Sequence, residues 1–190
     1  MSAAQARAIR LLDLLLALAL LLVMGLPMLA LALAIRLSDG GPALFRQQRV
    51  GRRRALFTVL KFRTMHSDVR GANAHRTGRG DPRITLLGRW LRPAHLDELP
   101  QLLNVLRGEM SLVGVRPDTP MQRGDYPPPY WKERHRHAPG ITGPAQVARG
   151  DLTLEQRSAL EREWLDRKSV PLYLSVLWQT IGKVFARSSH

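Results

Sequence analysis

An uncharged and almost wholly apolar run, Leu14–Ile35, most constrains how this chain can fold. Its 22 residues would form a straight helix of roughly 33 Å, about the thickness of the hydrocarbon core of a bilayer. A cleaved signal peptide fits poorly, because the run is long and the exit Arg36-Leu37-Ser38 is not a small-x-small cleavage site. We therefore expect a membrane helix within residues 1–38 and a catalytic or binding domain over residues 39–190.

Two features bear on how this helix would enter the membrane. Pro27 lies in the middle of the run, where it removes a backbone donor and favours a kink. Both flanks are basic, with Arg7 and Arg10 before the run and Arg36 and Arg52-Arg53-Arg54 after it, which favours a cytoplasmic position for both ends. A bent, re-entrant helix satisfies both observations. On these features alone, the re-entrant form and an ordinary single span are equally favoured.

The charge of the chain predicts a polyanionic partner. The net charge is +14, and only four of the 29 basic residues are lysines, so arginine dominates. Such a charge is typical of proteins that contact nucleic acid, an anionic membrane surface or phosphorylated substrates, and composition does not choose among them. The chain contains no cysteine, which excludes disulfides, thiolate metal sites and thiol nucleophiles.

The pattern of apolar residues predicts an α/β chain made mostly of helices. Two short apolar runs within residues 43–65 fit either strands or short helices, and the polar stretch Ser67–Arg79 fits a loop. Helical patterns cover residues 84–92, 96–106, 154–166 and 170–185. The last of these has two equally weighted interpretations, a core-packing helix or an amphipathic helix lying at the bilayer interface.

An adjacent acid pair, Asp97-Glu98, begins the helical pattern over residues 96–106 and has several arginines nearby in the sequence. Neighbouring helical positions point about 100° apart, so the two carboxylates can divide labour. One could attack phosphorus or bind a metal such as magnesium while the other orients a ligand. From the residues alone, a solvated acid pair that suits the helix dipole is the favoured interpretation.

Three basic positions are candidates for phosphate contacts. Arg116 precedes Pro117, which favours an extended backbone that would present the guanidinium from a stiff segment. Lys61 and Arg63 would share one face of an extended segment. A strand end and a basic surface strand are the ordinary alternatives for these positions. His135-x-His137 has a metal-site spacing, but flanking arginines would repel a cation.

Five motifs occur in a recognisable order along nearly the whole chain. They are FRQQRVG (Phe45–Gly51), KFRTM (Lys61–Met65), DPRIT..GR.LR (Asp81–Arg92), LDELPQLLNVLRGEMSLVGVRP (Leu96–Pro117) and PGITGPAQV (Pro139–Val147). Together they resemble the bacterial sugar transferase family, the small monotopic polyprenyl-phosphate phosphoglycosyl transferases. The resemblance implies a re-entrant membrane helix with Pro27 at its kink, and a helix-rich catalytic domain with interfacial helices on the cytoplasmic face of the bacterial inner membrane.

The resemblance also implies an activity and its residues. A phosphosugar would pass from a UDP-sugar to undecaprenyl phosphate, with release of UMP, through an intermediate on the nucleophile Asp97; Glu98 would be its partner, and both would lie at Mg²⁺ or Mn²⁺. Arg116 would grip phosphate, and Lys61, Arg63, Arg83 and Arg92 match basic positions near the site. The implied partners are the two substrates and membrane lipids, without nucleic acid, and a homodimer is left open. The product would start a cell-surface glycan such as an exopolysaccharide, capsule, O-antigen or glycoprotein glycan.

One departure from the family pattern concerns the phosphate-gripping segment. Val115 stands where the family usually has proline before its arginine, so we expect a less rigid backbone there. This change prompts one alternative function, a catalytically weakened membrane scaffold. Charge alone prompts another, a membrane-tethered nucleic-acid-binding protein. The motifs do not specify which sugar would be transferred.

Overall fold

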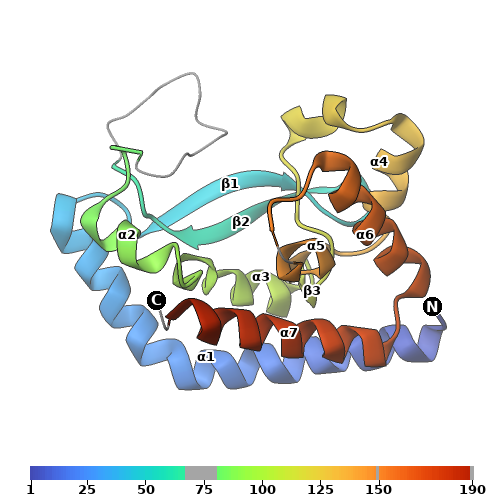
Figure 1. The fold of residues 1–190 in the computed structure, drawn as a ribbon. Coiled ribbons are helices and arrows are strands. Elements are labelled where there is room, and N and C mark those ends of the chain that lie inside the picture. The colour runs from blue at the N-terminus through green and yellow to red at the C-terminus, as the bar shows by residue number, and fades with distance from the viewer. Residues whose placement is uncertain (67–80, 149, 189–190) are drawn as a thin grey trace.

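The computed structural model describes residues 1–66, 81–148 and 150–188 (Figure 1). The predicted loop Ser67–Arg79 lies outside the described residues. The α-helices are α1 (Ala3–Asp39), α2 (Leu86–Leu91), α3 (Gln101–Arg107), α4 (Pro128–Arg134), α5 (Pro144–Val147), α6 (Leu154–Arg167) and α7 (Val170–Ser188). The strands are β1 (Leu44–Val50), β2 (Leu56–Phe62), β3 (Ser111–Val113) and β4 (Gly140–Thr142), and the 3₁₀ turns are η1 (Arg52–Arg54), η2 (Leu96–Glu98) and η3 (Pro120–Asp125).

The two apolar runs that fitted either strands or helices form an antiparallel hairpin, β1–β2. The hairpin lies above α3 in Figure 1, and β2 packs against that helix. Asn104 of α3 fastens the two together, because its amide accepts a hydrogen bond from the Leu60 backbone N–H and donates one to the Thr58 carbonyl. A single fully buried side chain therefore satisfies two backbone groups of β2.

A second, very small sheet joins β3 and β4 in parallel. Gly114 follows β3 and Gly140 begins β4, and the two backbones are so close that a Cβ on Gly140 would collide with the Gly114 amide nitrogen. Glycine is needed at this crossing because no side chain fits between the strands. The segment that carries Arg116 leaves β3 immediately after this point.

Helix α1 forms the base of the molecule and packs against the rest of the chain in two places (Figure 1). Ile9 and Ala17 join the main apolar core, whereas Ile35 joins a second cluster beside β2 and α2. Between these contacts, Leu22 and Leu26 are 77% and 80% exposed. The helix is long and apolar enough to cross a membrane, and Figure 1 shows it changing direction in its middle part. Pro27 lies inside this helix.

A buried carboxylate connects the first half of α1 to the core. Asp13 is 3% exposed, and its Oδ1 atom accepts hydrogen bonds from the Ser111 hydroxyl, the Leu112 backbone N–H and the Tyr173 hydroxyl, at 3.0, 2.8 and 2.7 Å. These donors come from β3 and α7. Burial of a charge is unfavourable unless hydrogen bonds replace its hydration, and these three donors replace it here.

A second polar contact, one turn earlier on α1, reaches α3. The guanidinium of Arg10 donates to the carbonyls of Val105 and Leu106, at 2.6 and 3.0 Å. These carbonyls lie in the last turn of α3, where the Gly108 N–H also reaches the Val105 carbonyl and where a positive charge is favoured. Arg10 therefore stabilises the helix that follows the Asp97-Glu98 pair.

The helices α2, α6 and α7 match their predicted positions closely, whereas α4 and α5 were not predicted. The predicted helix over residues 96–106 is divided into the short turn η2 and the helix α3, with Pro100 preceding α3. Gly108 ends α3 in the left-handed region, at φ 81°. In α7, Tyr173 and Val176 are buried in the core while Trp178 is 76% exposed, so this helix packs inward and also presents an aromatic side chain outward.

We expect the Asp13→Leu substitution to lower the free energy of unfolding by about 3 kcal/mol, because it leaves buried donors on β3 and α7 without an acceptor. Asp13→Asn keeps an acceptor oxygen in place, so its loss should be smaller, about 1 kcal/mol. Thermal unfolding of the detergent-solubilised protein measures both changes. The exposed Asp151→Leu is the control, and an equal effect of Asp13→Leu and Asp151→Leu would contradict this role.

Candidate active site

A cavity of about 1310 Å³ opens between the hairpin, the C-terminal part of α1, η2, η3 and the segments that follow α2 and β3. Most of the charged residues that the sequence singled out line this cavity, namely Lys61, Arg63, Arg83, Arg92, Asp97 and Arg116. Glu98 lines a small adjoining cavity, together with Lys61 and Arg116. Pro27 lies elsewhere, inside α1. The cavity wall carries more cations than acids, which suits a ligand with several phosphate charges.

The acid pair lies on the turn η2 rather than within a regular helix. His95, which precedes the turn, has a left-handed backbone at φ 55°. Such a conformation is unfavourable for a residue with a side chain, by roughly 1–2 kcal/mol, and it turns the chain sharply between α2 and η2. The turn places the two carboxylates in different surroundings, with Asp97 at the large cavity and Glu98 against two cations.

Glu98 is held by an ion-pair network. Its Oε1 atom lies 2.6 Å from Lys61 Nζ and 3.3 Å from Arg116 Nη2. Burial alone would raise the pKa of the Glu98 carboxyl, but the charges of Arg116 and Lys61 outweigh it and lower this pKa to about 2. Burial lowers the pKa of Lys61, and Glu98 partly opposes that change. Glu98 is therefore a permanent negative charge that orients both cations.

Asp97 differs from its neighbour because it has no ion-pair partner among the described residues. Burial raises the pKa of the Asp97 carboxyl to about 6, although Lys61 acts against this rise. The carboxylate thus lines the cavity without an ion pair from a described residue, although a backbone N–H contributes a hydrogen bond, and it is mostly ionised at neutral pH. A carboxylate that is desolvated and unpaired is a better nucleophile than one held by a salt bridge.

The other three predicted cations, Arg92, Arg83 and Arg63, lie in different surroundings. Arg92 contributes positive charge beside Asp97, and its buried Nη1 atom has no hydrogen-bond partner among residues 1–66, 81–148 and 150–188. Arg83 is engaged by Asp81, at 2.6 Å. Arg63 is buried, and its Nη2 atom donates to the Ile35 carbonyl in the last turns of α1, at 3.3 Å. Arg92 is the cation best prepared for an incoming anion, because an unpaired buried donor is costly until a ligand satisfies it.

The carboxylates of Asp97 and Glu98 fit a divalent cation whose remaining ligands are substrate phosphate oxygens and water. The described residues contain no cluster of three or more His, Cys, Asp or Glu side chains able to hold a metal by themselves. Asp97 forms no ion pair with a described residue, and the hydrogen bonds that Glu98 accepts from Lys61 and Arg116 fall on its Oε1 atom rather than on Oε2. Mg²⁺ is commonly bound by one or two carboxylates together with substrate phosphates and water, so these residues fit Mg²⁺ or Mn²⁺.

The sequence analysis missed two groups of residues at this site. Arg49 of β1 lines both cavities and donates to the Pro117 carbonyl at 2.9 Å, although the motif that contains it was recognised. Asp118 and Arg134 form a buried ion pair at 2.5 Å, and both residues contribute to the wall of the large cavity. His135 lies 3.5 Å from Asp118, so this histidine of the His-x-His pair faces a carboxylate of the same network. The motif FRQQRVG was the sequence signal that could have identified Arg49.

The sequence model of the family described as bacterial sugar transferase matches residues 4–187. The chain belongs to the bacterial sugar transferase family. The match includes α1 and all the candidate site residues, so the membrane helix and the cavity are parts of one family unit.

Three curated members of the bacterial sugar transferase family illustrate the similarity. An undecaprenyl-phosphate glucose phosphotransferase from Komagataeibacter xylinus is 44% identical over 82% of this chain and 32% of its own length. A UDP-glucose:undecaprenyl-phosphate glucose-1-phosphate transferase from Caulobacter vibrioides is 45% identical over 78% and 58%. The uncharacterised sugar transferase EpsL from Bacillus subtilis is 40% identical over 92% and 86%. The chain therefore spans about a third of the first of these relatives and somewhat over half of the second.

We expect isosteric substitutions of the two acids to affect stability differently. Glu98→Gln leaves Lys61 and Arg116 without their counter-charge and should lower the free energy of unfolding by about 2 kcal/mol, below the value for a fully buried pair because Arg116 is 41% exposed. Asp97→Asn removes a poorly solvated, unpaired charge, so the free energy of unfolding should stay within about 0.5 kcal/mol of the wild type or rise. Thermal unfolding of the matched pair measures this difference. A greater loss for Asp97→Asn would contradict the assignment of Glu98 as the structural anion.

Proposed function

We propose that the protein transfers a phosphosugar from a UDP-sugar to undecaprenyl phosphate and releases UMP. The observation that carries this proposal is the unpaired carboxylate of Asp97 in a cation-lined cavity. Family membership supports it, and the names of two relatives include undecaprenyl phosphate and glucose. UDP-glucose is therefore the first donor to test. The lipid-linked product would start the assembly of a cell-surface glycan.

The proposed chemistry has two displacements at one phosphorus atom. An Asp97 oxygen forms a bond to the sugar-bearing phosphorus of the donor, and the bond from this phosphorus to the bridging oxygen breaks, so UMP leaves with the electron pair. An oxygen of the lipid phosphate then attacks the same phosphorus and displaces Asp97, which regenerates the carboxylate. Arg116 and Arg92 would hold the phosphate oxygens, and Lys61 would add charge beside Asp97.

A divalent cation would be held by Asp97 and Glu98 together with phosphate oxygens, and it would neutralise charge on the departing UMP phosphate. Glu98 has a further role that needs no metal. It orients Lys61 and Arg116 toward the phosphate group, because both cations contact the same carboxylate oxygen.

We further propose that α1 is re-entrant and that the cavity faces the cytoplasmic side of the bacterial inner membrane. Ile9 and Ile35 pack against the same globular body, whereas Leu22 and Leu26 between them are exposed. A helix that packs against the globular body on both sides of its apolar middle segment can enter and leave the bilayer on the same face. Pro27, within that middle segment, would support the bend.

We expect purified wild-type protein in lipid nanodiscs, supplied with Mg²⁺, undecaprenyl phosphate and UDP-glucose or another UDP-sugar, to release UMP. Asp97→Asn should lower this rate by about 10⁴-fold, because the nucleophile is lost. Without lipid phosphate, the wild type should release a single burst of UMP and gain the mass of one phosphosugar on Asp97. Turnover by Asp97→Asn would refute the assignment of Asp97 as the nucleophile. Failure of the folded wild type to release UMP with any UDP-sugar would refute the transfer reaction.

The orientation of α1 can be tested cleanly because the chain has no cysteine. We expect Ser2→Cys and Ser38→Cys to react with a membrane-impermeant maleimide from the cytoplasmic side only, since the helix would enter and leave on one face. In a Pro27→Ala background, a fraction of Ser2→Cys should become reactive from the opposite side. Labelling of Ser2→Cys in the wild-type background from the opposite side would establish a single span instead.

A further inference from the structure

The backbone segment that carries Arg116 is held at four consecutive carbonyls. The Val115 carbonyl accepts from the Gly140 N–H at 2.9 Å, and the Asp118 carbonyl accepts from the Val50 N–H at 2.8 Å. The two carbonyls between them accept from arginine side chains, Arg116 from Arg134 at 3.1 Å and Pro117 from Arg49 at 2.9 Å. These hydrogen bonds restrain the segment although position 115 lacks the family proline, and the effect of Val115 on its rigidity stays a prediction.

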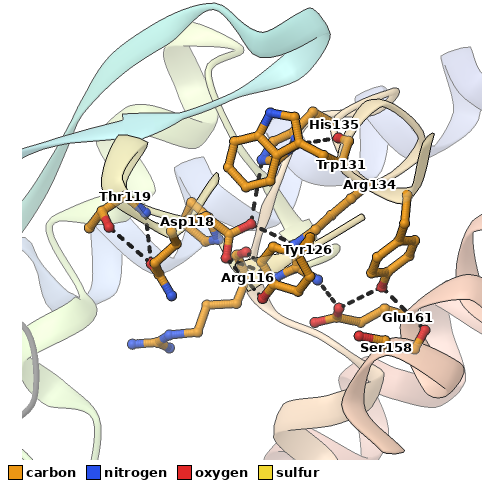
Figure 2. A network of polar contacts seen from close by, with 12 residues as sticks. Arg116, Asp118, Thr119, Tyr126, Trp131, Arg134, His135, Ser158 and Glu161 are labelled. Atoms are coloured by element: carbon orange, nitrogen blue, oxygen red, sulfur yellow. Dashed lines mark hydrogen bonds and ion pairs between the residues drawn. The ribbon is translucent and has the colours of Figure 1, made fainter. Parts of the chain in front are cut away.

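Arg134 is the central cation of this arrangement, and its side chain is only 1% exposed. Its Nε atom donates to Asp118 Oδ2 at 2.5 Å, and its Nη2 atom contacts both Asp118 Oδ1, at 3.2 Å, and the Arg116 carbonyl. Its Nη1 atom forms an ion pair with Glu161 of α6. Figure 2 shows this network, with the Arg116 side chain extending away from it.

The ion pairs of Arg134 with Asp118 and Glu161 are buried, and the unfavourable desolvation of these charges indicates that they do more than join α4 to α6. Buried ion pairs contribute little net stability, because desolvation of the charges offsets their attraction. Only a planar guanidinium can contact a carboxylate with two nitrogens and a neighbouring carbonyl at the same time. The group that receives the third contact is the backbone of Arg116, whose own guanidinium lines the cavity 3.3 Å from Glu98.

We propose that Arg134 is a positioning residue that fixes the backbone of Arg116, so that the Arg116 guanidinium is aimed at the diphosphate of the bound nucleotide. This inference rests on the proposed function only for the identity of the anion. Arg134 lies in the wall of the cavity, but its side chain is buried and its nitrogens contact Asp118, Glu161 and the Arg116 carbonyl, so it acts through Arg116. Asp118 contributes to this positioning, because its two hydrogen bonds fix the orientation of the Arg134 guanidinium.

A double-mutant cycle with UDP as the probe tests this proposal without requiring turnover. Isothermal titration of the solubilised protein with UDP, at constant Mg²⁺, compares the wild type, Arg134→Lys, Arg116→Ala and the double variant. Arg134→Lys should weaken UDP binding about tenfold, the scale of one charge-assisted hydrogen bond. In the Arg116→Ala background the same substitution should change the affinity less than about twofold, because coupled residues are not additive.

A matched variant separates positioning from general stability. Glu161→Gln weakens the other ion pair of Arg134 without touching the Arg116 carbonyl. It should lower the melting temperature yet leave the affinity for UDP within about twofold of the wild type. If Arg134→Lys does not fold, the isosteric Asp118→Asn takes its place in the cycle with the same expected coupling.

Three results would overturn the positioning role. They are an equal loss of UDP affinity in both Arg116 backgrounds, a loss in Glu161→Gln as large as that in Arg134→Lys, and no UDP binding by the folded wild type. UMP release is measured separately on the same proteins. Wild-type protein that binds UDP with the expected coupling but never releases UMP would refute the proposed reaction and leave the positioning role supported.

Discussion

The structure depends on how one charge at the start of an apolar helix is satisfied. Asp13 cannot face lipid as a carboxylate without a large desolvation cost, so the chain must bring donors to it. Those donors come from β3 and α7, and β3 leads directly into the segment of Arg116. The long apolar helix α1 is thus joined to the part of the cavity that carries Arg116 by side-chain hydrogen bonds as well as by apolar packing.

The candidate site depends on two neighbouring carboxylates with opposite environments. Burial raises the pKa of Asp97 to about 6, whereas Arg116 and Lys61 overcome burial and lower that of Glu98 to about 2. Separation of this kind lets chemically similar groups take different roles. In the proposed reaction, Glu98 stays charged and keeps the cations in place, while Asp97 alternates between free carboxylate and phosphorylated group.

Local patterns in the sequence predicted the longer helices well, but they did not predict the short elements α4, α5 and β4 or the long-range polar contacts. The helices α6 and α7 followed from apolar spacing, and Gly108 marked the end of α3. The hairpin β1–β2 was ambiguous because its apolar runs are short, and its identity depends on packing against α3. The site residues were predicted through motif resemblance, whereas Asp13 and Arg134 were missed because their partners lie far along the chain. The division of the chain at residue 38 stays a prediction.

The two packing positions of α1 also restrict how the length of this helix can vary. Asp13 and Ile35 are 22 residues apart, and each must face the protein at a fixed rotation about the helix axis. An insertion or deletion of one residue between them would turn one contact by about 100° relative to the other. Only changes close to whole helical turns, of about three, four or seven residues, preserve both contacts. Adaptation of the helix to a thicker or thinner bilayer can therefore occur only in discrete steps.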